Sequence, residues 1–188
     1  LHSTLARFFT NPITILVIYV LGLYGLYLTN VFGSLMSSHI GHIVMTTHFL
    51  VAGILLAYVA IGIDPKPAPL PFWGRMMLVL AAIILHTFFA VVMMSSTTLI
   101  GATWYSQVRP PWLTDPVRDS MLGGQIAWGV GEIPTLIMMI IIAVQWARSD
   151  ERESKRRDRF TNDHGDHELD DYNAYLNKLN ELNQQAKK

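Results

Sequence analysis

The length of the segments without charge constrains the fold more than any other feature of this chain. Residues 8–63 contain no Lys, Arg, Asp or Glu, and residues 76–108 contain none either. A water-soluble domain spreads charged residues over its surface helices, whereas a membrane-spanning helix needs about 20 predominantly apolar residues. Hydrophobic residues make up 51% of the chain and charged residues only 15%. The sequence therefore predicts an all-α, polytopic transmembrane helical bundle.

Prolines and the return of charged residues divide the apolar sequence into separate helices. Pro12 is expected to open the first helix, because proline at a helix start loses no hydrogen bond. The proline-rich segment 64–69 is expected to end the second helix, and Pro110 and Pro111 to follow the third. We predict four spans within a membrane domain of residues 1–148, at about residues 13–32, 40–63, 76–100 and 124–146.

Residues 149–188 have a different composition, in which charged and polar residues dominate. Apolar residues recur there every three or four positions, which predicts a short amphipathic helix on the membrane or on a partner. A partly disordered tail is the alternative. The apolar residues of this pattern are Tyr172, Tyr175, Leu176, Leu179 and Leu182.

Basic residues gather directly after the fourth predicted span, between Arg148 and Arg159. Because Lys and Arg near helix ends stay on the cytoplasmic side, we expect the tail to be cytoplasmic. With four spans, the N-terminal end of the chain is then cytoplasmic as well. The chain begins at Leu1 rather than at a methionine, so we expect it to be part of a longer protein with further helices upstream.

Four potential metal ligands open the second predicted span: His39, His42, Met45 and His48. We call them the His/Met ladder. Imidazoles in or beside a bilayer are costly without partners and therefore indicate function. A three-residue step drifts by about 60° on an α-helix, so all four cannot bind one ion. Met45 can share a site with His42 or with His48, and His39 is expected in the loop before the helix.

The rise of a helix predicts the depth of each polar residue, and with it two layers. Asp119, Gln125, Trp128 and Glu132 are expected to follow one face of the fourth span. Taken alone, a membrane histidine such as His86 often only hydrogen-bonds a neighbouring helix. The predicted outer layer holds His39, His42, Met45, Met93, Met94, Asp119 and Met121, and the deeper layer holds His48, His86 and Glu132.

Imidazole and thioether without thiolate suit copper, and methionine favours Cu(I). The chain has no cysteine. Haem is the alternative, with His48 and His86 as a bis-histidine pair. No nucleophile and base set, phosphate loop or zinc-protease motif appears, so we predict neither an enzyme nor a nucleic-acid partner. The predicted copper ligands are His42, Met45, His48, His86, Met93 and Met94, supported by His39, Asp119, Gln125, Trp128 and Glu132.

Two motifs carry a family resemblance. The first motif covers residues 39–48 and continues to Gly53, and the second is the pattern Asp119-x5-Gln125-x2-Trp128, with Gly123-Gly124 before Glu132. Together they resemble the cytochrome c oxidase assembly factor family CtaG of Gram-positive bacteria. The resemblance covers residues 8–148. Similar domains in some actinobacteria follow a CopD-like domain, so a CopD–CtaG fusion is one arrangement of the upstream region.

The resemblance implies a multi-pass protein of the bacterial plasma membrane. Such a protein aids maturation of the haem–copper oxidase, through delivery of copper to the catalytic subunit from the outer half of the membrane. Its partners would be oxidase subunits or a respiratory supercomplex, and the lipid bilayer. Two other functions stay open at this point: a haem-binding membrane electron carrier, and a metal-free accessory subunit of a respiratory complex.

Overall fold

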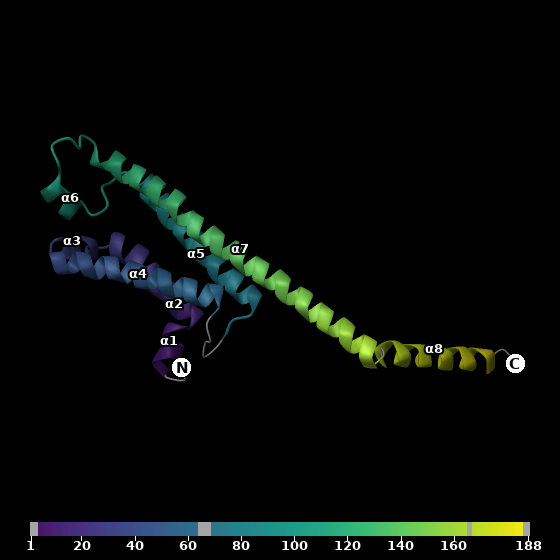
Figure 1. Cartoon of the computed structure of the whole chain (residues 1–188). Coiled ribbons are helices and arrows are strands. Elements are labelled where there is room, and N and C mark those ends of the chain that lie inside the picture. The colour runs from purple at the N-terminus through teal and green to yellow at the C-terminus, as the bar shows by residue number, and fades with distance from the viewer. Residues whose placement is uncertain (1–3, 64–68, 165–166, 186–188) are drawn as a thin grey trace. The chain divides into compact units, whose positions relative to one another are not determined.

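The computed structural model describes residues 4–63, 69–164 and 167–185, and these residues form helices and turns with no strand among them. The all-α class predicted from the sequence is thereby confirmed. In chain order the elements are α1 Thr4–Phe9, α2 Pro12–Val20, the π-helix η1 Leu21–Gly25, α3 Val31–Met36, α4 His39–Ile61, α5 Phe72–Ser95, α6 Ala102–Val108, α7 Pro116–His164 and α8 His167–Gln185 (Figure 1).

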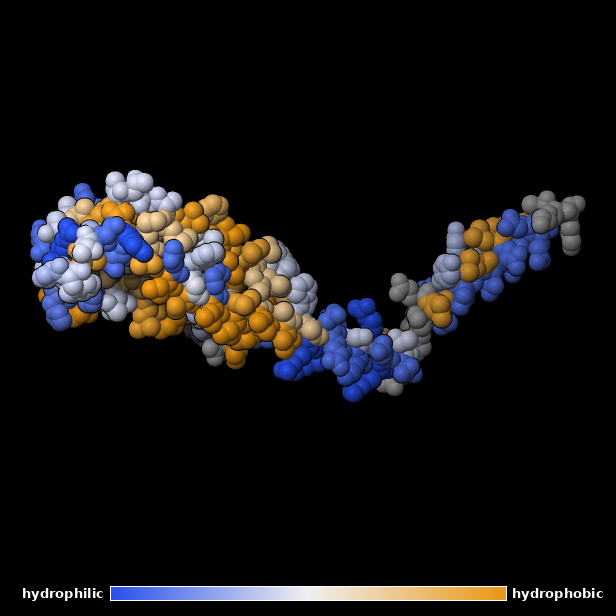
Figure 2. Space-filling model, turned by 90° about the horizontal axis from the view of Figure 1, so that it is seen from above, coloured by the Kyte–Doolittle hydropathy of each residue, from blue (hydrophilic) through white to orange (hydrophobic). Residues whose placement is uncertain are grey.

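Among the described residues, three helices are long and apolar enough to cross a membrane: α4, α5 and α7. A shorter apolar helix, Pro12–Gly25, stands where the first span was predicted. Large apolar side chains of these helices lie on the surface, and Figure 2 shows this hydrophobic surface on the bundle. Such a surface suits lipid or neighbouring membrane helices as its surroundings. The structure thus confirms a polytopic helical membrane protein, with one of the four predicted spans shorter than expected.

A threonine explains why the first span is short. Thr29 donates its hydroxyl to the Gly25 carbonyl at 2.5 Å and accepts the Val31 N–H at 3.2 Å. The first bond also occurs inside continuous helices, as at Thr46 in α4. The second is a local turn, in which the side chain and not a helical carbonyl receives the Val31 N–H. The chain turns at Thr29 and Asn30 and resumes as α3, so residues 13–32 form no single helix.

α4 and α5 also differ from their predicted ends. The Ser38 hydroxyl accepts the Gly41 N–H at 3.0 Å and caps α4, which makes His39 its first residue rather than part of a loop. α4 ends at Gly62 in the left-handed conformation, with φ of 68°. The predicted proline stop at 64–68 lies outside the described residues. α5 stops at Ser95, because Ser96 bonds locally to Thr98.

α7 extends beyond both predicted ends of the fourth span. The Asp115 carboxylate accepts the N–H groups of Val117 and Arg118 at 3.1 and 3.0 Å, and Pro116 is the first helical residue. After residue 146 the helix continues through charged residues that form helices well, among them the pair Glu151–Lys155 at 2.6 Å.

Removing the helix cap at Asp115 tests whether α7 begins at Pro116. Asp115→Ala should destabilise the first turn of α7 by about 1 kcal/mol, because two N–H groups lose their acceptor. We expect faster amide hydrogen exchange at Val117 and Arg118 in detergent-solubilised protein. Asp150→Ala, in the middle of α7, should leave that exchange unchanged.

α5 and α7 pack along a seam that repeats every seven residues. Gly124 lies against Met93, and seven residues later Gly131 lies against His86. Seven residues further, Met138 joins the buried cluster that contains Val79. Equal steps forward along α7 and backward along α5 show that the two helices run antiparallel, as Figure 1 also shows. Small residues at such a seam let helix backbones approach closely.

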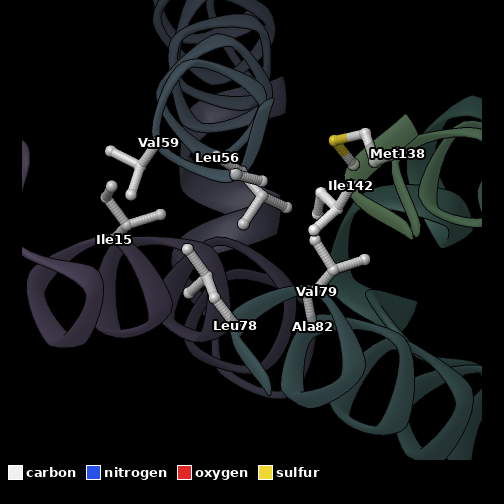
Figure 3. Packing of buried hydrophobic residues seen from close by; sticks show 9 residues of the cluster. Ile15, Leu56, Val59, Leu78, Val79, Ala82, Met138 and Ile142 are labelled. Atoms are coloured by element: carbon white, nitrogen blue, oxygen red, sulfur yellow. The ribbon is translucent and has the colours of Figure 1, made fainter. Parts of the chain in front are cut away.

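One hydrophobic core joins these helices. Ile15 from α2, Leu56 and Val59 from α4, Val79 from α5 and Ile142 from α7 are each at most 3% exposed (Figure 3). The core lies near the end of α4 and the start of α5. None of the candidate ligands belongs to this core, although His86 follows the core residue Ala82 by about one helical turn.

Contacts within the chain divide it into two units, residues 1–144 and 145–188. The first contains the apolar helices and every candidate ligand. The second contains the charged end of α7 and α8, which is longer than the short tail helix predicted from the sequence.

Candidate functional site

A cavity of about 400 Å³ lies among the apolar helices, walled largely by aromatic and aliphatic side chains. Its aromatic walls form a connected cluster, in which Phe32 stacks on Tyr27 at 5.1 Å and on Tyr105 at 5.9 Å between ring centroids. A mostly apolar cavity with few polar groups is the usual form of a small-ligand site. The groups in its lining that can bind a metal or donate a hydrogen bond are Tyr27, His86, Met93, Tyr105, Asp119 and Ser120.

Three of the predicted site residues meet in this cavity. His86 and Met93 line it from α5, and Asp119 lines it from the first turn of α7. His86 and Met93 share a helix face because they are seven residues apart. Partial burial, and after it the Asp119 carboxylate, raise the pKa of Tyr105 above its ordinary value. The Tyr105 phenol therefore stays neutral and able to donate a hydrogen bond.

Glycine places the His86 ring against α7. A Cβ on residue 131 would collide with Cε1 of His86 and would lie 2.8 Å from Nε2. Only glycine leaves room for the ring at this position. The neighbouring Gly129, by contrast, has nothing within 4 Å of an added Cβ. The identity of residue 131 thus controls where the imidazole lies.

Glu132 is held by two donors within the bundle. The Thr87 hydroxyl donates to Oε1 at 2.8 Å and the Trp128 indole N–H donates to the same oxygen at 3.1 Å. Thr87 follows His86 on α5, and Glu132 follows Gly131 on α7. The carboxyl group therefore couples the two helices beside the imidazole. This explains why Trp128 is inside the helix rather than at its end.

Thr87→Val should lower the free energy of unfolding by about 1–2 kcal/mol, because it keeps the shape of the side chain and removes one donor to Glu132. Thermal unfolding in detergent, followed by circular dichroism, would measure this loss. Thr46→Val is the matched control, since the exposed Thr46 hydroxyl donates to the His42 carbonyl of its own helix at 2.9 Å and not to a neighbouring helix among the described residues. Equal losses in the two variants would contradict a role for the Thr87–Glu132 bond.

His48 and Met45 share a second site, a groove of about 360 Å³ whose other lining residues belong to the segment 21–35 and Val44. Gly22 also lines this groove, and a Cβ there would lie 2.6 Å from Nε2 of His48. That nitrogen is buried and has no hydrogen-bond partner among the described residues. An unpartnered imidazole nitrogen therefore belongs to a residue that shares this groove with a thioether.

His42 contacts a methionine that the sequence analysis did not select. Its Nδ1 lies 3.4 Å from the sulfur of Met36, the last residue of α3. Only the two serines at 37 and 38 separate α3 from α4, so a tight turn brings Met36 back onto the ladder. This short connection was the available signal. His39 and His42 are both exposed.

The predicted site residues thus separate into three groups. His86, Met93 and Asp119 belong to the cavity, Met45 and His48 to the groove, and His42 to the contact with Met36. Met94 packs on Gly124, and Gln125 is exposed. In the described part of the chain, no three His, Asp or Glu side chains lie together as one ion would require. His86 and His48 line different hollows, which does not favour a bis-histidine haem site.

Apolar helices long enough to span a membrane, with polar side chains packed among them, define this chain as a polytopic helical membrane protein. The chain matches the family described as cytochrome c oxidase caa3 assembly factor (Caa3_CtaG) over residues 1–149. It belongs to this family, which confirms the resemblance carried by the ladder and by the Asp119–Glu132 segment. The matched region contains all predicted site residues.

Relatives extend the match beyond the family region. The uncharacterized protein Mb0105 of Mycobacterium bovis is 40% identical over 183 residues, and the uncharacterized protein ML1998 of Mycobacterium leprae is 37% identical over 183 residues. Each match covers 97% of this chain and 28% of the relative. The chain therefore spans little more than a quarter of the length of these relatives. No solved structure matches it.

Proposed function

We propose that this chain handles copper as a cargo during assembly of a cytochrome c oxidase. Its family supplies the assembly role, and the groove supplies the reason to name copper. The observation that carries the proposal is the His48 Nε2 atom, which is buried and has no hydrogen-bond partner among the residues described, on a side chain that lines the groove together with Met45.

A buried nitrogen without a partner costs about 1–3 kcal/mol, so such an atom usually has a ligand to meet. A neutral imidazole nitrogen can bind a metal directly. The thioether of Met45 is a soft ligand that selects Cu(I) over Zn²⁺ or Mg²⁺. Two ligands of different kinds in an open groove hold an ion weakly, which suits a protein that must release it again.

The cavity is a second candidate copper site, with ligands of the same kinds as the groove. His86 and Met93 again combine an imidazole with a thioether, and Asp119 adds a carboxylate at the start of α7. A carboxylate attracts a cation that enters from water, whereas the deeper ligands are uncharged. We expect copper to meet Asp119 before it meets the soft ligands of α5.

The recipient we propose is a copper-containing subunit of the oxidase within the same membrane. Direct transfer between two membrane proteins would keep Cu(I) bound to protein ligands and out of bulk water. The ladder begins α4, and with the predicted orientation this end of α4 faces outward. We propose accordingly that loading and transfer take place in the outer half of the bilayer.

Copper titration of the full chain in detergent tests this proposal. With a colorimetric Cu(I) chelator as competitor, we expect the protein to retain copper and to show no Soret band after growth with haem precursors. Retention of haem with a Soret band would favour the electron-carrier alternative. Stoichiometric co-purification with mature oxidase and no copper binding would favour an accessory subunit.

A further inference from the structure

α8 carries an apolar seam with the spacing of a coiled coil. Tyr172, Leu176 and Leu179 are separated by four and three residues, and Leu169 and Asn183 continue the same alternation at either end. Apolar residues at alternating steps of three and four are the a and d positions of a heptad. With Leu176 at a, Tyr172 and Leu179 occupy d.

These seam residues are large and face water. Tyr172 is 57% exposed, Leu176 42% and Leu179 39%. Figure 2 shows orange, hydrophobic residues on α8 among blue, hydrophilic ones. The family match ends at residue 149, before α8 begins. Burying an exposed row of apolar side chains stabilises a surface helix, so the seam of α8 is expected to pack against a second surface.

The charges of α8 argue against a lipid surface. Asp170, Asp171 and Glu181 outnumber the single Lys178 among the charged residues of its described side chains. Helices that lie on anionic membranes carry Lys and Arg on their polar face, which adds electrostatic attraction to apolar burial. An acidic helix is repelled by such a membrane instead.

The same charges permit α8 to pair with itself. They occupy the b, c and f positions, which point away from the seam. Between Leu169 and Asn183 the e and g positions that flank the seam are uncharged, so over this stretch two copies would meet without like charges across the interface. These flanking residues are Asn173, Tyr175, Asn180 and Leu182.

We propose that α8 is a self-association helix, which pairs with α8 of a second copy of this chain as a parallel two-stranded coiled coil. Two copies in one membrane insert the same way round, which favours the parallel arrangement. A helix this short pairs only marginally in solution. Anchoring by the apolar helices raises the effective concentration of one α8 near another. The relatives' matches cover 97% of the chain and so include α8.

Cysteine cross-linking tests the pairing directly, because the chain contains no cysteine of its own. The full chain with Leu179→Cys, at a d position, and the full chain with Glu181→Cys, at an f position, are oxidised with diamide in lipid nanodiscs or membrane vesicles. Facing d positions can come within disulfide distance, whereas f positions point apart. We expect about tenfold more cross-linked dimer from Leu179→Cys than from Glu181→Cys.

A second substitution distinguishes cross-linking through a packed seam from cross-linking through random encounters of two chains. Leu176→Asp, added to Leu179→Cys, should abolish the cross-link, because it places a charge at an a position. Ala174→Asp, at an f position, should leave the cross-link in place. Equal yields from Leu179→Cys and Glu181→Cys would overturn the proposal, and so would absence of any dimer or a Leu179→Cys cross-link that survives Leu176→Asp. None of these results depends on copper.

Discussion

Replacing Met45 by leucine and His48 by glutamine together is expected to weaken copper retention by about tenfold or more, since both soft ligands of the groove are lost. Leucine keeps the volume of methionine without its sulfur. Glutamine keeps a polar side chain of similar length and donates poorly to Cu(I). Oxidase assembly should fall in parallel in cells in which this protein is the copper source, measured as copper content and activity of the purified oxidase.

The fold should survive this double substitution, because both residues line a groove and neither belongs to the core. Circular dichroism in detergent should show unchanged helicity. Met77→Leu is the matched control: Met77 lies on α5, is 52% exposed and lies outside the groove. Unchanged copper content in the purified double variant would count against the groove as a copper site.

Adding one methyl group at Gly131 is expected to have the second large effect. In Gly131→Ala the new Cβ meets the His86 ring, so the ring or helix α7 must shift. Overpacking of this kind costs about 1–3 kcal/mol of stability. We also expect weaker copper binding in the cavity, because His86 loses its position beside Met93. Unfolding in detergent and a Cu(I) titration measure the two effects.

Gly129→Ala provides the control on the same helix. Its Cβ would meet nothing within 4 Å, and alanine is a better helix former than glycine. We expect Gly129→Ala to leave copper binding unchanged and to stabilise the protein by up to about 1 kcal/mol. If both alanine variants behaved alike, the close approach of His86 to α7 would not be a determinant of the site.

The long helices follow from the sequence because composition alone excludes most alternatives to them. Two charge-free segments leave a membrane bundle as the remaining solution, and the family match agrees with it. Helix ends were less predictable. The first span ends at a turn in which the Thr29 hydroxyl accepts the Val31 N–H, and threonine is too common in membrane helices for this to be foreseen.

The grouping of the site residues was the least predictable part. The rise along a helix predicts that His48 and His86 lie at similar depth. It does not predict which neighbouring helix each side chain contacts. Gly22 receives the His48 ring and Gly131 receives the His86 ring, so the two imidazoles serve different hollows. Met36 reaches His42 through a turn of two serines, which no periodicity within α4 could reveal.

X-ray absorption at the copper edge of the Cu(I)-loaded full chain tests the central claim most directly. A site made of His48 and Met45, or of His86 and Met93, predicts Cu(I) with both imidazole nitrogen and thioether sulfur in its ligand shell. The sulfur contribution should decline in Met45→Leu or in Met93→Leu. A shell of nitrogen and oxygen alone, unchanged by either substitution, would contradict the account.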